Sequence, residues 1–424
     1  MKIDIIMLSL YTFVLYFVYY LAYIPALWNT KIKHWLKEQD RIIEKIPLKK
    51  NRNRLWVHCA SLGEFEQVRP ILERFRATDT PEIIVSFFSA SGYEKLKNDP
   101  LIDNITYFPL DVPHRMQAFI ERIEPDQVIF VKYEFWFNCL NILHQKQIPF
   151  YLVAGVFHSK QIFFIPVIGK YFIKYLHYFT FIFLQNQKSF LLAKHLNLKN
   201  RGVYGDPRCD RVLGTLKNPQ AFSIIEHFKD ADRQDANPIL ILGSSWQAEE
   251  DLVIQYLKVN LGQDKLIYKI IIAPHDVSKK HIQEIIQKLG NIKYTLYSTC
   301  DENTNFDNIP VLIIDSIGIL SKIYRYADIA FIGGGFGKGL HNILEAAVFG
   351  IPIFFGPKIE KYQEALDLID KGGAFIIEQY AQLALLLSLF ENKEIREKAG
   401  VKARQYILDN VGAGERIYDC LNHE

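Results

Sequence analysis

The sequence predicts an α/β protein made of two Rossmann-like domains with a cleft between them, preceded by a transmembrane helix. Short apolar runs alternate with amphipathic stretches, the alternation starts again past the middle of the chain, and a long uncharged run lies near the N-terminus. At roughly 150 residues per domain, 424 residues suit two or three domains. Because 49% of the residues are apolar and 14% are aromatic, the chain can bury large cores, which excludes a disordered protein.

The first element is an uncharged run of 23 residues from Ile5 to Leu27. At about 1.5 Å per residue a helix of this length extends roughly 34 Å, which is enough to cross a bilayer core of about 30 Å. We therefore expect residues 1–30 to be a membrane anchor rather than a signal peptide, which has a shorter apolar core and a small-residue cleavage site. A buried core helix is the alternative. Four aromatic residues mark the expected interface at the end of the span: Tyr19, Tyr20, Tyr23 and Trp28.

Residues 31–54 form a basic juxtamembrane segment, with nine Lys or Arg against three acids. The positive-inside rule places this side of the span, and with it the globular part, in the cytoplasm, so we expect a single-pass protein of the cytoplasmic (inner) membrane. Each cation near an anionic leaflet adds about 1 kcal/mol of attraction. The total charge of only +3 argues against nucleic-acid binding over the whole surface. Five widely separated cysteines without a CxxC pair fit a reducing compartment and predict neither disulfides nor a zinc site.

The first Rossmann-like domain is expected over residues 55–216. Amphipathic helices such as 66–75 and 117–123 fit between its strands. The strands are apolar on both faces, which predicts a parallel sheet covered by helices. The seven expected strands are 55–60, 83–88, 105–108, 127–132, 150–154, 180–184 and 202–204.

A polar stretch over residues 217–237 has the composition of a linker, and the second domain is expected over 238–424, with its last helix able to pack back on the first domain. Such sheets bind ligands beyond the carboxyl ends of their strands, so two of them facing each other would form a cleft. The seven expected strands are 239–242, 270–273, 294–297, 311–314, 329–332, 353–355 and 375–377.

A glycine-rich loop gives the strongest signal in the second domain. The strand 329–332 runs into five glycines within residues 333–339, and a helix is expected to begin near His341. Backbone N–H groups in such a loop, together with a helix N-terminus, favour an anion. The loop lacks both the Walker and the GxGxxG spacing. Asn342 and Glu345 lie three apart, on one face of the expected helix, where a carboxylate can hold ribose hydroxyls. The alternative is a tight structural turn.

Polar residues at strand ends form the candidate site of the first domain. Glu64 follows the first strand and Glu134 follows the fourth, so both are candidates for acid–base chemistry. The alternative for Glu64 is a helix N-terminal charge stabilised by the dipole. Ser89, Ser91 and Gly92 close another strand and offer hydroxyl and N–H groups to a carboxylate or phosphate.

No metal site is expected, because the twelve histidines show neither HExxH nor paired spacing. His275 follows Pro274 at a strand end, which suits an anion or ribose contact better than a metal ligand.

Taken together in order and spacing, these motifs resemble one family, the Kdo (3-deoxy-D-manno-octulosonic acid) transferases of lipopolysaccharide biosynthesis. The resemblance covers nearly the whole chain, including the N-terminal anchor. The matching segments in the first domain are Ser61–Glu64, Ser89–Gly92, Pro109–Asp111, Glu124–Asp126, Tyr133–Trp136 and Gly205–Asp210. Those in the second domain are Gly243–Ser245, Asp315–Leu320, Gly339–Glu345 and Pro352–Pro357.

The resemblance implies a GT-B glycosyltransferase that moves Kdo from CMP-Kdo to a lipid A precursor at the inner leaflet. It implies inversion of the anomeric centre, and neither a metal nor another cofactor. Glu64 would be the general base, and Glu134 and Arg208 would stabilise the transition state. Ser89, Ser91 and Gly92 would face the sugar carboxylate. The residues implied at the CMP site are Pro274, His275, Ile317, Gly318, Ile319, Asn342, Ile343, Leu344 and Glu345.

Four positions depart from the family pattern. Lys132 stands where the family has an acid, and Arg208 replaces a lysine, which keeps the charge but changes the geometry. Ile319 replaces a glutamate, and His275 stands where an arginine is expected. Three alternatives stay open: another GT-B nucleotide-sugar transferase with a lipid-linked acceptor, a non-hydrolysing sugar-nucleotide epimerase with the same two-domain layout, and an inactive membrane-anchored scaffold.

Overall fold

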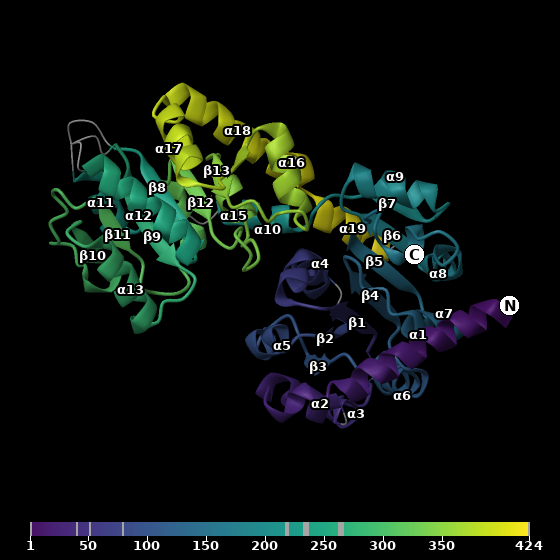
Figure 1. Cartoon of the computed structure of the whole chain (residues 1–424). Coiled ribbons are helices and arrows are strands. Elements are labelled where there is room, and N and C mark those ends of the chain that lie inside the picture. Colours follow the sequence, from purple (N-terminus) through teal and green to yellow (C-terminus); the bar gives the residue numbers. More distant parts are fainter. Residues whose placement is uncertain are drawn as a thin grey trace. The chain divides into compact units, whose positions relative to one another are not determined.

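The computed structural model describes residues 2–39, 41–50, 52–78, 80–216, 220–231, 237–261 and 267–422. The chain divides into two compact units, which Figure 1 shows with their elements labelled. The first unit comprises Met1–Asp210 and Asn410–Glu424, and the second comprises Arg211–Asp409. The first unit therefore ends six residues before the boundary expected at residue 216, and it includes the C-terminal segment of the chain.

The first unit contains a parallel seven-stranded sheet in the order β3-β2-β1-β4-β5-β6-β7. Neighbouring side chains of β1 alternate between two cores: Trp56 belongs to one, and Leu55 and Val57 to the other. Both faces are therefore buried, as the apolar runs predicted. The strands are β1 (Arg54–Cys59), β2 (Glu82–Phe87), β3 (Asn104–Tyr107), β4 (Gln127–Val131), β5 (Phe150–Gly155), β6 (Phe181–Leu184) and β7 (Arg201–Val203).

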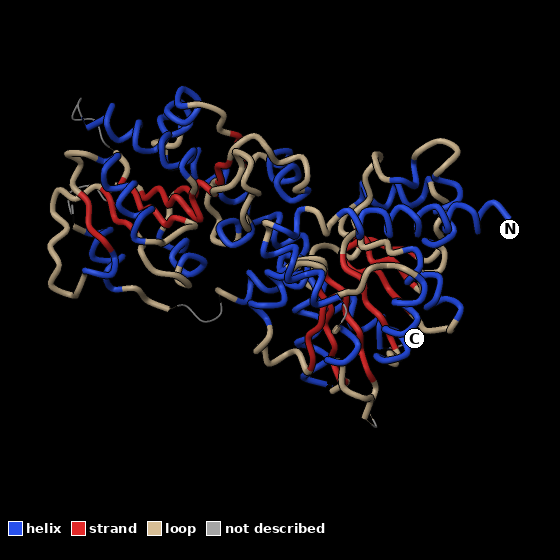
Figure 2. The backbone as a smooth tube through the Cα atoms, turned by 60° about the horizontal axis from the view of Figure 1, so that its bottom comes forward, coloured by secondary structure: helices blue, strands red, loops and turns tan. Residues whose placement is uncertain are grey.

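Helices cover both faces of this sheet (Figure 2). They are α1 (Lys2–Leu21), α2 (Thr30–Gln39), α3 (Ile42–Lys45), α4 (Leu62–Thr78), α5 (Ala90–Leu96), α6 (Pro113–Ile123), α7 (Phe137–Gln145), α8 (Gly169–Leu176), α9 (Gln187–His195) and α19 (Ala413–Asn422), with the 3-10 turns η1 (Pro25–Leu27) and η2 (Ile162–Phe164). Among the helices that the structure describes, the segment Ile6–Leu27 alone is long and apolar enough to cross a membrane, with a mean hydropathy of 1.6.

The C-terminal helix α19 completes the first unit. Ile417 and Leu421 enter the core that contains β1 and β2, and the ring of Tyr418 packs edge-on against Phe75 of α4, with centroids 4.9 Å apart. The chain leaves the first unit within α10 (Arg208–Gly214) and returns at the end of α18 (Lys393–Asn410). The two segments of the first unit are linked at these points. The Asp210 carboxylate, at the end of the first segment, accepts hydrogen bonds from the backbone N–H groups of Gly412 and Gly414, at the start of the second.

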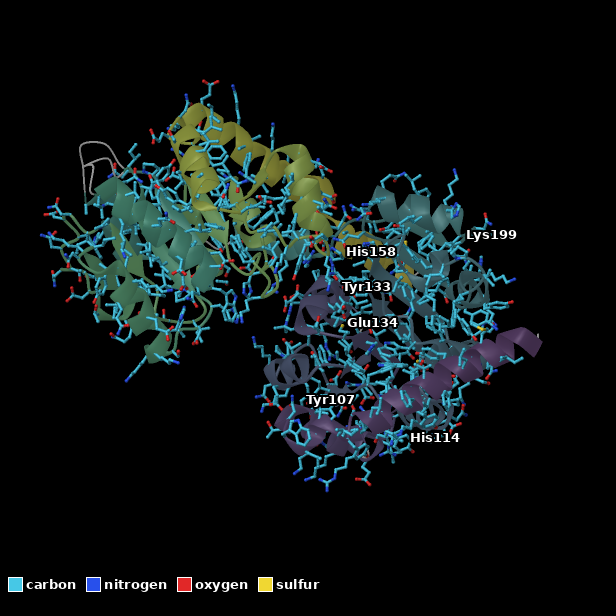
Figure 3. All side chains as sticks on the ribbon, in the orientation of Figure 1. Tyr107, His114, Tyr133, Glu134, His158 and Lys199 are labelled. Carbon is cyan, nitrogen blue, oxygen red and sulfur yellow. The ribbon has the colours of Figure 1, made fainter. Side chains whose placement is uncertain are left out.

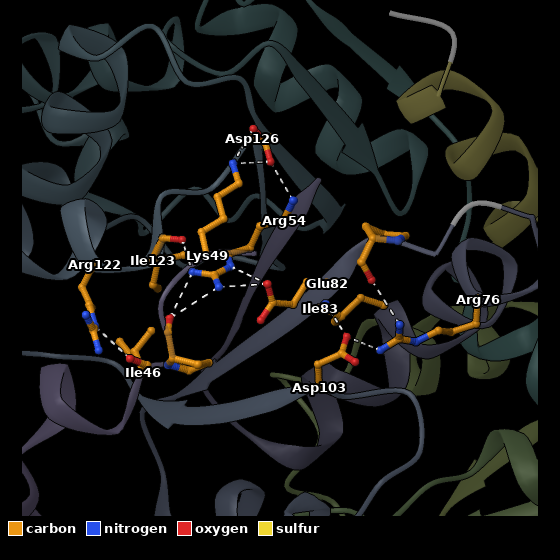
Figure 4. A network of polar contacts seen from close by, with 12 residues as sticks. Ile46, Lys49, Arg54, Arg76, Glu82, Ile83, Asp103, Arg122, Ile123 and Asp126 are labelled. Carbon is orange, nitrogen blue, oxygen red and sulfur yellow. Dashed lines mark hydrogen bonds and ion pairs between the residues drawn. The ribbon is translucent and has the colours of Figure 1, made fainter. Parts of the chain in front are cut away.

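Arg54 does not belong to the basic surface that the sequence predicted over residues 31–54. It begins β1 and is fully buried, with its guanidinium against Glu82 Oε2 at 2.9 Å and the carbonyl oxygen of Ile123 at 2.6 Å (Figure 4). Beside it, Lys49 Nζ lies 2.7 Å from the carboxylate of Asp126. These cations are held by protein groups, so Arg54 adds no charge to the surface.

The second unit contains another parallel seven-stranded sheet, in the order β10-β11-β9-β8-β12-β13-β14. Its strands are β8 (Ile239–Ser245), β9 (Lys269–Pro274), β10 (Tyr294–Leu296), β11 (Val311–Ile313), β12 (Ile329–Ile332), β13 (Ile353–Phe355) and β14 (Ala374–Ile376). Its other elements are α11 (Ser223–Asp230), α12 (Gln247–Leu261), α13 (Lys279–Leu289), η3 (Tyr297–Thr299), α14 (Leu320–Ile323), η4 (Tyr324–Tyr326), α15 (Leu344–Ala347), α16 (Gln363–Lys371) and α17 (Tyr380–Leu389), with α18.

The prediction of a linker over 217–237 is wrong for its central part. Residues 223–230 form α11, whose Ile225 and Phe228 are fully buried. The carbonyl oxygen of Phe228 accepts a hydrogen bond of 2.7 Å from the buried Lys269 Nζ. The polar residues around this helix obscured a short amphipathic stretch that packs on the second unit.

Candidate active site

The carboxyl ends of β1 and β4 place two glutamates in the first unit. These strands are neighbours in the sheet, Glu64 lies in the first turn of α4 directly after β1, and Glu134 lies three residues after β4. Both side chains are buried, with exposures of 6% and 8%. Because the carboxyl ends of parallel strands meet at one edge, the two strand-end residues predicted from the sequence share one site.

The pKa of Glu64 is raised to about 7. Burial is the main cause, and the charge of Glu134 adds to it. The N–H groups of Ala60 and Ser61 and the ammonium of Lys132 oppose the rise. A carboxylate with a pKa near neutrality is a stronger base than an ordinary glutamate and is still largely ionised at slightly alkaline pH. The chemistry available at this position is therefore proton abstraction.

Glu134 is held by the rings of Trp136, two residues further along the chain, and of His58 in β1. Trp136 Nε1 donates to Glu134 Oε2 at 2.8 Å and lies 3.1 Å from His58 Nε2, which is itself 3.4 Å from the same carboxylate oxygen. The other ring nitrogen of His58 lies 2.9 Å from Ser86 Oγ. Sequence reasoning missed His58, because a histidine inside an apolar strand is indistinguishable from a core residue; its place one residue before the end of β1 was the available signal.

Lys132 brings a cation to this pair of carboxylates. It directly follows β4 in the left-handed region, with φ of +64°, a conformation that side chains with a Cβ seldom adopt. The pKa of His158 is lowered mainly by burial, with Lys188 and Lys132 adding to this, and Lys132 also helps to lower the pKa of Asp206. The His158 ring lies 6.4 Å from that of Tyr133, and Figure 3 labels both residues together with Glu134.

Arg208 lies at the start of α10 and forms an ion pair with a buried carboxylate. Its Nη2 is 2.6 Å from Asp206 Oδ2, which also accepts a hydrogen bond of 2.8 Å from Gln185 Nε2. Burial alone would raise the pKa of Asp206, but the adjacent Arg208 and the more distant Lys132 bring it below its usual value. Asp206 thus fixes the direction of the guanidinium, and the side chain of Arg208 keeps 12% exposure.

The loop after β2 adjoins that of Glu64 through a hydrogen bond of 3.0 Å from Ser89 N to the carbonyl oxygen of Ala60. Gly92 packs against Phe87, whose ring would lie 2.4 Å from a Cβ at this position, so this glycine is required by packing. The side chain of Ser91 lies outside the described part of the structure. Ser89 as a whole residue is half-buried.

In the second unit the glycine-rich loop follows β12, as predicted. Gly334, Gly337 and Gly339 all have positive φ, and a Cβ on Gly335 would lie 2.5 Å from the backbone nitrogen of Gly356. The buried carboxylate of Glu249 accepts hydrogen bonds from Gly334 N at 2.7 Å and from Trp246 N at 3.1 Å. Glu249 therefore ties the loop after β8 to the glycine-rich loop.

Three aromatic rings from different strand ends stack beside this loop. The ring of His275 stacks on both Trp246 and His341, at centroid distances of 4.7 and 4.6 Å, and Trp246 Nε1 donates to His341 Nε2 at 3.2 Å. Lys338 Nζ lies 5.4 Å from the Trp246 ring. A cavity of about 450 Å³ adjoins the group, lined among others by Trp246, Glu249, His281, Gly334 and Lys338. Sequence reasoning identified His275 but missed Trp246 and Lys338; the position of Trp246 directly after β8 was the available signal.

The predicted ribose pair is brought together, but the helix begins later than expected. Asn342 Nδ2 donates to Glu345 Oε1 at 3.1 Å, and Asn342 Oδ1 accepts from Leu344 N. The helix α15 starts only at Leu344, because the asparagine side chain satisfies a backbone donor of the first turn in place of a preceding helical residue. Burial raises the pKa of Glu345, and Arg211 opposes this rise.

The other predicted CMP-site residues have different surroundings. Pro274 ends β9, and Ile343 and Leu344 are buried in the core. The backbone N–H of Leu344 and the carbonyl oxygens of Ile343 and Leu344 are hydrogen-bonded within the protein. Ile317 is 84% exposed, and Gly318 has φ of +99° in the turn that precedes Ile319 and α14.

A family model described as 3-deoxy-D-manno-octulosonic-acid transferase matches residues 34–211. A 3-deoxy-D-manno-octulosonic acid transferase of Aquifex aeolicus is 26% identical over 367 residues, covering 85% of this chain and 93% of that protein. Over most of its length the chain is similar to Kdo transferases, and the family model over residues 34–211 supports that family. The chain is accordingly a glycosyltransferase.

Two further comparisons concern a longer relative and a solved structure. A bifunctional glycosyltransferase/methyltransferase of Fusobacterium nucleatum is 24% identical over 361 residues, which cover 81% of this chain and 54% of that protein. The crystal structure of a putative UDP-N-acetylglucosamine 2-epimerase from Listeria monocytogenes superposes with a TM-score of 0.60 at 14% identity, covering 87% of this chain and 96% of that one. The likeness shows the fold, and the two Rossmann-like units are those of a GT-B glycosyltransferase.

Proposed function

We propose that this glycosyltransferase moves Kdo from CMP-Kdo to a lipid A precursor, with inversion at the anomeric carbon and Glu64 as the general base. The observation that carries the proposal is the buried carboxylate of Glu64, whose pKa is raised to about 7 by burial and by Glu134. The likeness to Kdo transferases supports Kdo as the transferred sugar. The raised pKa of Glu64 supports its role as the base.

In the proposed step, an acceptor hydroxyl gives its proton to Glu64 while its oxygen bonds to the anomeric carbon of Kdo. The bond from that carbon to the phosphate oxygen breaks, and CMP leaves with the electron pair. A single displacement of this kind inverts the carbon. Lys132 and Arg208 supply positive charge in the first unit, which favours the anions present in the reaction. Glu134, held by Trp136, maintains the negative charge that makes Glu64 basic.

In the second unit, the glycine-rich loop and the stacked rings are the proposed nucleotide site. In the glycine-rich loop the N–H groups of Gly333, Gly334, Gly337 and Gly339 donate to protein oxygens. The proposed phosphate contacts are therefore the N–H groups of Gly335, Phe336 and Lys338, and the Lys338 side chain adds a cation where the family's arginine has been replaced by His275. Asn342 and Glu345 suit ribose hydroxyls. Because CMP is a good leaving group with one phosphate, we propose that no metal takes part, and we expect turnover to be unchanged by a chelator.

The acceptor is proposed to be a lipid, so the enzyme works at a membrane. The apolar segment Ile6–Leu27 and the exposed cations of residues 33–45 support attachment to the cytoplasmic face of the inner membrane. We place both units in the cytoplasm, where nucleotide sugars are found.

Glu64→Gln tests the proposal, because it removes the base but keeps the size of the side chain. We expect CMP binding to persist and transfer to fall by on the order of 10²–10⁴-fold. The matched control is Glu94→Gln on α5, whose side chain is 57% exposed. Purified variants receive a CMP-Kdo-generating system and lipid A precursor, and products are read by mass spectrometry. Near wild-type turnover of Glu64→Gln would remove Glu64 from this role, and transfer only from another nucleotide sugar would contradict the proposed donor.

A further inference from the structure

The N-terminal helix α1 has two different faces. One face packs on the first unit, where Met7, Leu8 and Tyr11 adjoin one core and Leu15 and Tyr16 adjoin another (Figure 1). The opposite face consists of aliphatic and aromatic side chains that are 45–66% exposed: Ile6, Leu10, Phe13, Val14, Phe17, Val18 and Leu21. Their spacing of three or four residues follows the helical repeat, so they form one continuous stripe.

The packed face carries hydroxyl groups, and the first unit binds them. Tyr11 Oη donates to Asp111 Oδ2 at 2.8 Å, and Thr12 Oγ1 lies 3.0 Å from Asn138 Nδ2. Asp111 is fully buried and also accepts from the backbone nitrogens of Asn138 and Cys139, in the first turn of α7. The middle of α1 is therefore bonded to a carboxylate that lies inside the globular fold.

The end of α1 takes part in a small core of its own. Tyr19 is buried together with Ala26, Leu36, Leu110 and Val112, which come from the N-terminal segment and from the loop before α6. Two further hydroxyl contacts reach α6: Tyr16 Oη lies 2.9 Å from His114 Nδ1, and Arg115 Nη2 lies 3.3 Å from Tyr19 Oη. Detachment of α1 would expose this core and remove one of the three donors to Asp111.

These contacts conflict with a helix that crosses a bilayer. Tyr11 lies near the middle of the 20-residue helix α1, so a spanning orientation would place it roughly 15 Å deep in hydrocarbon, away from Asp111. We infer that α1 lies in the plane of the membrane, docked on the first unit through Tyr11 and Thr12, with the stripe from Ile6 to Leu21 buried in the cytoplasmic leaflet. This inference rests on the proposed membrane attachment and replaces the expected single span.

The chemistry around the stripe favours anionic lipid as its occupant. No charged residue interrupts it, and the exposed apolar surface continues through Ile24, Leu27 and Trp28, the last two 76% exposed. Lys33, Lys37 and Arg41 follow in the next residues and are exposed. An apolar stripe beside interfacial aromatics and cations is typical of helices that lie on an anionic membrane.

Reporter fusions to the full-length protein separate the two orientations. Green fluorescent protein fluoresces only if it remains in the cytoplasm, because it does not become fluorescent after export in the unfolded state. Alkaline phosphatase is active only in the periplasm. With the globular part in the cytoplasm, a docked α1 predicts that both termini fluoresce and that neither phosphatase fusion is active. An active N-terminal phosphatase fusion, with fluorescence at the C-terminus, would overturn the inference.

A binding measurement tests the lipid-facing stripe. Phe13→Ser with Phe17→Ser is expected to weaken binding to vesicles of phosphatidylglycerol about tenfold or more, and wild-type binding to phosphatidylcholine vesicles is expected to be weaker. Leu385→Ser with Val401→Ser is the matched control, since both side chains are well exposed in the second unit. Unchanged vesicle binding together with loss of a wild-type dimer in sedimentation would assign the stripe to a second copy and contradict the inference. Neither readout uses sugar transfer, so failure of the proposed reaction would leave the orientation result standing.

Discussion

Replacing Glu64 by glutamine is predicted to stabilise the protein at alkaline pH while strongly reducing its activity. A raised pKa means that the folded protein resists ionisation of this carboxyl more than the unfolded chain does. The pKa rises from 4.5 to about 7, and each unit corresponds to about 1.36 kcal/mol. Ionisation of Glu64 therefore lowers the free energy of unfolding by roughly 3 kcal/mol at pH 8, and a glutamine avoids that loss.

The sign follows from proton linkage. The contribution of a group with a raised folded pKa is complete below the unfolded pKa of 4.5 and is lost as the pH rises through about 7. Wild type and Glu64→Gln should accordingly be nearly equal in stability at pH 4.5 and differ most above pH 7.

Urea unfolding at several pH values measures the difference, with Glu94→Gln as the exposed control. We expect the free energy of unfolding of Glu64→Gln to exceed that of wild type by about 3 kcal/mol at pH 8, with most of the gain arising above pH 5. Equal stability of the two proteins at pH 8 would refute the reasoning, because Glu64 would then ionise as readily in the fold as in the unfolded chain.

Three further predictions concern other parts of the molecule. Arg54→Met leaves the carboxylate of Glu82 buried without its cation, so urea unfolding should show a loss of about 3–5 kcal/mol. Gly335→Ala forces a Cβ against backbone at 2.5 Å and should abolish CMP binding in calorimetry, whereas Gly214→Ala, with nothing within 4 Å, should bind normally. Lys132→Met removes a charge that lowers the pKa of Glu64, so the acidic limb of the pH profile of the transfer rate should move to higher pH. An acidic limb at the wild-type pH would contradict this.

The regular parts of the fold could be predicted because local patterns determine them. Strands such as β12 (Ile329–Ile332) and β13 (Ile353–Phe355) are apolar runs buried on both faces, and the structure has them at the expected residues. The helix α11 was obscured because only two of its eight residues are buried, and its polar neighbours have the composition of a linker. Its formation depends on packing against a distant part of the chain, which no local pattern records.

The candidate site was predictable to the extent that it lies at strand ends. Glu64 and Glu134 were found because parallel strands bring their carboxyl ends together, whereas His58 supports Glu134 from inside a strand, where its role depends on Trp136 and Ser86. The uncharged run of α1 suggested a membrane span because tyrosine and threonine carry no formal charge. Their hydrogen bonds to Asp111 and Asn138 become visible only in the folded chain.

The return of the chain to the first unit has a consequence for biosynthesis. α19 supplies Ile417, Tyr418 and Leu421 to a core whose other members precede residue 210, so a ribosome must finish nearly the whole polypeptide before that core can close. While the second unit is synthesised, the core of the nascent first unit stays incomplete and the surface of α4 that α19 covers stays exposed. Loss of the last dozen residues would therefore harm the N-terminal half of the enzyme rather than the half that directly precedes them.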